Sequence, residues 1–209
     1  MILESIRNAG LSITGLEAIV VTHAHVDHIG GVPAVLDSRS VPVYVGAPEL
    51  PMVIGAWTES ATPMDVIANL WRPRFVPWSV RIALAGGVEQ VRVPGAVGVA
   101  DGTTLDIPGQ PRVVLTPGHT SGHACLQVGN VILTGDALVT GHAVTGRRGP
   151  QLIPDVFHND PETADAALDK IAALDASVIV PGHGPVWRGS AADAVAEVRR
   201  TSSRREEAG

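Results

Sequence analysis

The stretch His23-Ala24-His25-Val26-Asp27-His28-Ile29-Gly30-Gly31 places three imidazoles and a carboxylate within six residues. It comes just after the apolar run Ala18-Ile19-Val20-Val21, which has the β-branched composition of a buried strand. Histidine is the commonest metal ligand among protein side chains. Because Cys125 is the only cysteine, the cysteine-rich kinds of structural zinc site are excluded. The stretch therefore indicates a transition-metal site at the end of a strand, with zinc as the expected ion.

The composition favours one globular domain that binds neither nucleic acid nor membrane. Of the 209 residues, 45% are hydrophobic, which is enough for a sizeable core, and the net charge of −6 lacks the basic footprint of a nucleic-acid partner. The sequence contains neither an apolar stretch long enough to span a membrane nor the pattern of a signal peptide. A single cysteine, expected to be buried and inert, suits a reducing compartment. We therefore expect a cytoplasmic protein.

Hydrophobic periodicity predicts a single domain over residues 1–201, followed by a polar, charged tail at 202–209. An irregular, proline-containing stretch at about 47–86 is typical of an inserted helix-and-loop segment. Strands are predicted at 18–22, 41–45, 88–93, 97–100, 112–116, 124–128, 131–134 and 177–180, with a hairpin turn at 129–130. Helices are predicted at 3–9, 33–37, 61–70, 161–174 and 191–200.

Three later segments repeat the layout of the first, in which an apolar strand is followed by a tight turn and a metal-binding side chain. They are Thr116-Pro117-Gly118-His119-Thr120-Ser121-Gly122-His123, Leu133-Thr134-Gly135-Asp136 and Val180-Pro181-Gly182-His183-Gly184. Glycine in such turns lets the backbone approach a metal closely. Several strand ends on one edge of a sheet would bring these side chains to one point. Histidine and carboxylate ligands are typical of catalytic zinc sites, which keep a position open for water.

This ordered set resembles the metallo-β-lactamase-fold hydrolases over residues 16–188. The resemblance implies an α/β (α+β) fold, a four-layer αββα sandwich, and two Zn²⁺ ions per chain, with iron or manganese as the other ions that such ligands accept. It assigns His23, His25 and His119 to the first metal, Asp27, His28 and His183 to the second, and Asp136 to a position bridging both. A bridging aspartate is the pattern of the glyoxalase II, lactonase and related branches; true zinc β-lactamases mostly lack it.

The N-terminal β-hairpins of that family are absent from the sequence as it stands, since 22 residues precede His23. A misplaced start, a truncation, a divergent subfamily and a partner chain are the competing explanations. We expect a chain that is marginally stable or forms a homo-oligomer. We also expect no domain of the kind with which glyoxalase II binds glutathione, which argues against that activity. The only tyrosine, Tyr44, lies far in sequence from the loop where lactonases of this type place theirs, which weakens the lactonase interpretation without excluding it.

The resemblance predicts a hydrolase that uses a metal-bridging hydroxide to cleave an ester, thioester, lactone or similar bond of a small organic substrate. Asp27 and Asp136 are the expected catalytic carboxylates, Asp27 by orienting the attacking water and Asp136 through the metals. Two alternatives stay open. One is a persulfide dioxygenase-like oxidoreductase with a single iron, and the other is a truncated relative that binds metal without catalysis.

Four further residues are candidates for contact with the substrate: His123, His142, Trp71 and Arg74. For His123 the competing interpretation is a structural hydrogen bond at the start of a strand. For His142, and for His158, which falls in the same region of the sequence, the competing interpretation is a position in a surface loop. The stretch 71–75 predicts either a wall over the metals or a loop packed on the core.

Overall fold

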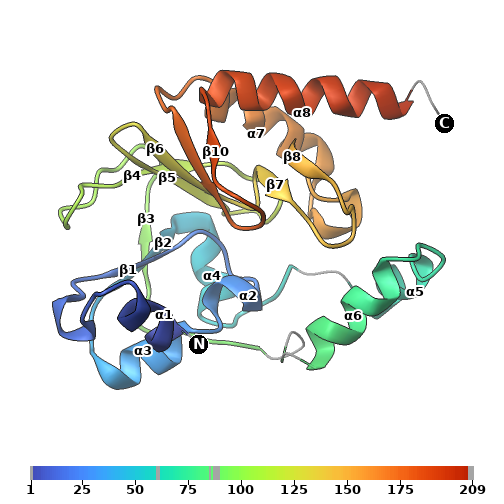
Figure 1. Cartoon of the computed structure of the whole chain (residues 1–209). Helices are drawn as coiled ribbons and strands as arrows, with labels where there is room; N and C mark the ends of the chain where they lie inside the picture. The colour runs from blue at the N-terminus through green and yellow to red at the C-terminus, as the bar shows by residue number, and fades with distance from the viewer. Residues whose placement is uncertain (1, 60–61, 85, 87–89, 207–209) are drawn as a thin grey trace.

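The computed structural model describes residues 2–59, 62–84, 86 and 90–206, which form two facing sheets between layers of helices (Figure 1). The smaller sheet has three parallel strands in the order β1 (Ile19–Val21), β2 (Val43–Gly46) and β3 (Val97–Val99). The larger sheet has the order β10-β9-β6-β5-β4, with β4 (Arg112–Leu115), β5 (Ala124–Val128), β6 (Val131–Gly135), β9 (Val178–Pro181) and β10 (Trp187–Arg188). A separate antiparallel pair joins β7 (Val139–Gly141) and β8 (Arg148–Gln151).

Successive side chains of a strand point to opposite faces of its sheet, and this alternation produces three apolar clusters. On β5, Cys125 packs with the outer helices α7 (Pro161–Ala172) and α8 (Ala191–Glu206), whereas Ala124 and Leu126 pack in the cluster between the sheets. On the smaller sheet, Val21 packs outward in a third cluster with residues of α2 (Val26–Ile29), α3 (Val32–Ser38) and α4 (Leu50–Val53). Three apolar interfaces separate four layers, which is the αββα sandwich that the family resemblance implies (Figure 1).

Helix α7 agrees closely with its sequence pattern. Asp160 caps the first turn by accepting a hydrogen bond from the backbone N–H of Thr163, and Pro161 occupies the first helical position, where a missing N–H costs nothing. The buried face consists of Ala164, Ala167, Leu168 and Ile171. The predicted turn at 129–130 is likewise confirmed, since it joins β5 to β6 in an antiparallel pair.

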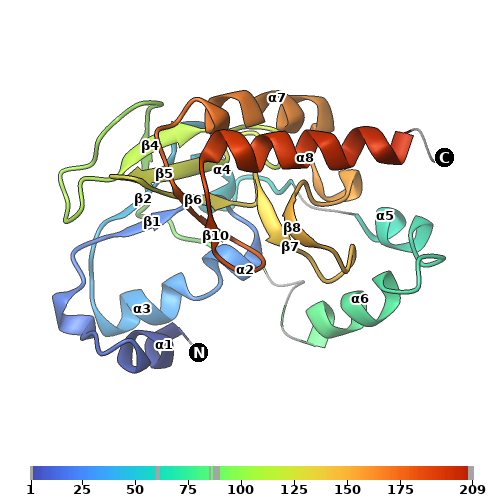
Figure 2. The same cartoon turned by 45° about the horizontal axis from the view of Figure 1, so that its top comes forward.

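The segment that follows β2 divides into two parts. The short helices η2 (Ala47–Glu49) and α4 pack against the smaller sheet, where Met52 and Val53 are buried. Helices α5 (Pro63–Ala68) and α6 (Phe75–Leu84) lie to one side of the two sheets in both views (Figures 1 and 2). We call residues 62–84 the helical arm. The predicted helix at 61–70 is confirmed in its described part as α5, whereas α6 was not anticipated, because Pro77 stands in its first turn.

Other elements differ from the sequence expectation. Residues 90–93 of the predicted strand 88–93 form no strand, and residues 88 and 89 lie outside the described part. The backbone of Val93 bonds to Val53 instead, and Pro94 follows it without an N–H to donate. Helix α8 continues to Glu206 where a frayed tail was expected from 202. The chain starts with α1 (Ile2–Asn8) and η1 (Ile13–Gly15), and η3 (Asp155–Phe157) precedes α7. Among the described residues, no helix has the length and apolar character that a membrane span requires.

Candidate metal centre

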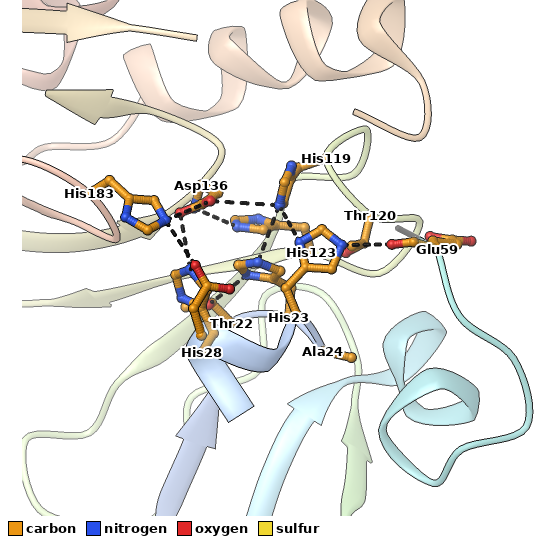
Figure 3. A network of polar contacts seen from close by, with 12 residues as sticks. Thr22, His23, Ala24, His28, Glu59, His119, Thr120, His123, Asp136 and His183 are labelled. Atoms are coloured by element: carbon orange, nitrogen blue, oxygen red, sulfur yellow. Dashed lines mark hydrogen bonds and ion pairs between the residues drawn. The ribbon is translucent and has the colours of Figure 1, made fainter. Parts of the chain in front are cut away.

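The direction of the strands gathers the candidate ligands at one edge of the larger sheet. Strand β6 is parallel to β9 and antiparallel to β5, which is itself antiparallel to β4, so β4, β6 and β9 end on the same side. His119, Asp136 and His183 follow these three strands. The end of β1 reaches the same place, because the carbonyl of Thr22 accepts a hydrogen bond from the backbone N–H of Ala124 at the start of β5. The predicted convergence of strand ends is therefore present (Figure 3).

Three histidines form the more enclosed half of the site. Nε2 of His119 lies 3.2 Å from Nε2 of His23 and 2.9 Å from Nδ1 of His25. The remaining nitrogen of His25, Nε2, contacts the backbone carbonyl of Glu59 at 2.6 Å, where it can only donate. That bond places the proton of His25 on Nε2 and leaves the lone pair of Nδ1 facing the other two imidazoles. His23 and His119 are buried.

Asp27, His28 and His183 form the more open half of the site. Nε2 of His183 lies 3.2 Å from Oδ2 of Asp27, and the side chains of these two residues are 32% and 43% exposed. Asp136 lies between the two halves. Its Oδ1 is 3.3 Å from Nε2 of His28, and its Oδ2 is 3.3 Å from Nε2 of His183 and 3.7 Å from Nε2 of His119. One carboxylate therefore faces both groups, and its geometry suits the predicted bridge.

Burial keeps the enclosed histidines in the neutral form that metal binding requires. Loss of solvent lowers the pKa of His23 and of His119 well below the usual value, and neighbouring imidazoles add to this effect. Burial opposes ionisation of Asp136, yet the adjacent imidazoles, His183 first, hold the pKa of its carboxyl well below normal. Hydrogen bonds to Asp136 and Asp27 in turn raise the pKa of His183 to about 10. The enclosed half of the site thus offers the lone pairs of neutral imidazoles, and the carboxylates of Asp136 and Asp27 offer negative charge.

This donor set fits divalent metal ions. Two imidazole nitrogens bound at about 2 Å to one tetrahedral zinc ion lie roughly 3.3 Å apart, close to the 3.2 Å and 2.9 Å found around His119. Nε2 of His28 and Oδ1 of Asp136 are buried and have no hydrogen-bond partner, although they face each other at 3.3 Å. Buried polar atoms are normally paired. A cation between these atoms would satisfy them.

His123 supports the site from behind and is not available to a substrate. It is completely buried, its Nε2 accepts a hydrogen bond from the backbone N–H of Asp136 at 3.1 Å, and its Nδ1 lies 2.8 Å from the hydroxyl of Thr116. Both ring nitrogens are therefore engaged inside the protein. The structural interpretation of His123 fits this geometry, and the candidate substrate contact does not.

The remaining substrate candidates lie at different places. His142 follows β7, and its ring centroid is 5.6 Å from that of His183. Arg74 on the helical arm reaches the loop after β7, since its guanidinium lies against the backbone of Gly146. Trp71 is three-quarters exposed, and the guanidinium of Arg72 lies over its ring at 5.2 Å. Contact of His142, Arg74 or Trp71 with a substrate stays a prediction.

Sequence reasoning placed His158 in a surface loop and missed three further residues around the site. His158 is buried instead, with its ring centroid 5.5 Å from that of His119. Trp78 of the arm approaches the site, since its ring centroid is 6.2 Å from that of His142. Glu49 and Glu59 accept hydrogen bonds from the loop after His119. An acidic residue within the apolar run 43–53 was the one available signal for Glu49.

The fold and the site together define a four-layer αββα protein with a two-part histidine and carboxylate centre. The chain belongs to the metallo-beta-lactamase superfamily, whose family model matches residues 1–183. It is 31% identical over 181 residues to the probable metallo-hydrolase YflN of Bacillus subtilis, a match that covers 81% of this chain and 64% of the relative. It is 29% identical over 170 residues to thioesterase pkgB of Emericella nidulans, covering 79% of this chain and 34% of the relative.

Solved structures agree with this family. TTHA1623, solved in a di-iron-bound form, superposes with a TM-score of 0.58 at 26% identity, over 90% of this chain and 78% of that protein. The chain spans less than two thirds of the length of each of the two curated relatives named above. Membership establishes a metallo-hydrolase type of fold whose His and Asp clusters suit metal ions.

Proposed function

We propose that this protein is a dinuclear metal-dependent hydrolase that cleaves an ester, thioester, lactone or similar bond of a small organic substrate. The position of Asp136 supports the proposal, because its Oδ1 faces His28 of the open half, while its Oδ2 lies near both His183 of that half and His119 of the enclosed half. His23, His25 and His119 would hold one ion, Asp27, His28 and His183 the other, and Asp136 both. Zinc is the expected metal, and a di-iron relative makes iron the first competitor.

Divalent metal ions in such a centre supply a water nucleophile near neutral pH and polarise a carbonyl oxygen. The protein's own contribution is to hold the ligands and to orient the reactants. Asp27 and His183 are the most exposed ligands of the site, so the substrate is expected to enter on their side. The carboxylate of Asp27 is ionised, since its hydrogen bond to His183 lowers its pKa against the opposing effect of burial. It can accept a hydrogen bond from water and orient that water toward the substrate.

No nucleophilic side chain of the protein is needed for this reaction. Cys125 is completely buried, and burial raises the pKa of its thiol to about 12. A thiol in that state is a poor nucleophile. The thioesterase among the relatives supports carboxylic thioesters as the first substrates to try, and the ester and lactone classes follow from the same carbonyl chemistry.

The test combines metal analysis with a substrate panel. Protein purified from cells should contain about two metal ions per chain and hydrolyse at least one member of a panel of thioesters, esters, lactones, β-lactams and phosphodiesters. Asp136→Ala should lose both metal and hydrolysis, while Asp37→Ala, at an exposed position of α3, should keep both. Unchanged hydrolysis in Asp136→Ala would contradict the dinuclear proposal. One iron per chain with no hydrolysis would favour the mononuclear oxidoreductase instead.

A further inference from the structure

Glu49 is a completely buried carboxylate at the end of η2, directly after β2. Burial raises the pKa of this group, and a buried acid is costly unless several donors satisfy it. Its two oxygens accept three hydrogen bonds. Oε1 accepts from the backbone N–H of Ala24 at 2.8 Å, and Oε2 accepts from the hydroxyl of Thr120 at 2.7 Å and from the backbone N–H of Gly122 at 3.0 Å.

These donors belong to the two loops that carry the enclosed histidines. Ala24 lies between His23 and His25, and Thr120 directly follows His119. The loops arise from different sheets, and Figure 3 shows Ala24 and Thr120 beside the imidazole cluster, on the side away from His183. The approach is tight, since a Cβ added to Gly122 would lie 2.0 Å from the backbone nitrogen of Glu49. One carboxylate therefore connects both histidine loops.

We propose that Glu49 is a positioning residue that sets the separation of His23 and His25 from His119, and thereby the affinity of the enclosed half of the site for metal. The inference rests on the metal centre of the proposed function and adds a residue to it. Outer groups that orient metal ligands commonly change metal affinity by about 10- to 100-fold. Without both oxygens of Glu49, the backbone N–H of either Ala24 or Gly122 has no acceptor there, and the loops are free to separate.

The two oxygens make a specific substitution informative. A glutamine at this position has one acceptor and one NH₂ group, and NH₂ cannot accept a hydrogen bond. Whichever way the amide is turned, the backbone N–H of either Ala24 or Gly122 loses its acceptor. Glu59 provides a matched control nearby, because its carboxylate accepts one backbone hydrogen bond from the same loop, from Ser121 to Oε2 at 2.7 Å. A glutamine there can keep that bond with its single oxygen.

The experiment titrates Co²⁺ into metal-free wild type, Glu49→Gln and Glu59→Gln, and follows the visible absorption of the bound ion. We expect Glu49→Gln to bind the ion in the enclosed half about 10- to 100-fold more weakly, with an altered spectrum, and Glu59→Gln to resemble wild type. Urea unfolding of the same metal-free proteins measures the free energy of unfolding of each variant. A loss of metal affinity that is larger than the loss of unfolding free energy is then not explained by instability.

Each outcome bears on one proposal or the other. If wild type binds no metal, the proposed function fails. If wild type binds Co²⁺ and Glu49→Gln binds it equally tightly with the same spectrum, the role of Glu49 is overturned while the metal centre stands. If Glu49→Gln does not fold, Thr120→Val decides, since it removes one donor to Glu49 and keeps the shape. That variant should bind several-fold more weakly, and wild-type affinity there would also overturn the inference.

Discussion

The backbone N–H of Asp136 donates a hydrogen bond to Nε2 of His123 over 3.1 Å. Because Nε2 accepts this bond, the proton of the neutral imidazole is on Nδ1, which faces the hydroxyl of Thr116 at 2.8 Å. A buried imidazole with both nitrogens engaged fixes the backbone of the carboxylate that joins the two halves of the site.

His123→Ala should destabilise the metal-free protein by about 3 kcal/mol, because it leaves a cavity and removes the acceptor of the buried backbone N–H of Asp136. His123→Gln should cost only about 1 kcal/mol, since its carbonyl oxygen can accept the bond from Asp136. Urea unfolding followed by circular dichroism measures both values. Equal losses in the two variants would contradict the assigned hydrogen bond.

Gly118, which directly precedes His119, has a φ of +124°, and a Cβ there would lie 2.1 Å from the backbone nitrogen of Ala164 in α7. Gly118→Ala should therefore cost about 3 kcal/mol or more, through backbone strain and overlap with the helix. Gly129 is the matched control, since its φ is +55° and nothing lies within 4 Å of its Cβ position.

Gly129→Ala adds only the strain of a left-handed residue, about 1 kcal/mol. Denaturant unfolding of the two variants separates the contributions. If Gly118→Ala is as stable as Gly129→Ala, helix α7 does not constrain the loop of His119 in the way that these distances indicate.

The ligand loops were predictable because each candidate residue comes directly after an apolar strand. The convergence of His119, Asp136 and His183 could be predicted from one rule, which is that the ends of parallel strands meet at the same edge of a sheet. The strands of the larger sheet were also predictable, because 112–116, 124–128 and 131–134 are short apolar stretches of strand-forming residues. These are local patterns, and a single sequence displays them.

The supporting residues were not predictable in this way. Thr120 and Glu49 are 71 positions apart, and only the packing of η2 against both loops brings them together. Helix α6 and the β7–β8 pair carry proline and glycine within their bounds, so local preferences argue against them. Trp78 lies near the site only because the helical arm packs against the loop after β7, and His158 only because the segment after η3 lies beside His119. Neither contact is visible in the local sequence.

Cys125 should be unreactive in the folded protein. Its side chain is completely buried between Thr116 and Thr134, and burial raises the pKa of its thiol to about 12. At pH 8 only about one thiol in 10,000 is then ionised, compared with roughly a quarter for a free cysteine. Ellman's reagent should therefore label the protein in guanidinium but not in buffer, and the native rate should rise with pH. Rapid labelling of native protein at pH 8 would show that the thiol is accessible.

The helical arm makes a last prediction possible, because its two tryptophans differ in their surroundings. The ring of Trp78 packs against Phe157 with centroids 4.9 Å apart and approaches His142, which in turn lies beside His183. Trp71 is three-quarters exposed. The rings of Trp78, Phe157 and His142 could contact the acyl group of a substrate. In that case Trp78→Ala should raise KM about tenfold and leave kcat unchanged. The value of kcat/KM should then fall about tenfold, equivalent to 1.4 kcal/mol of binding. The effect should grow along a series of p-nitrophenyl esters with longer acyl chains, since more apolar surface is buried. Trp71→Ala should follow wild type throughout, and a larger effect there than in Trp78→Ala would move the acyl contact to the exposed end of the arm.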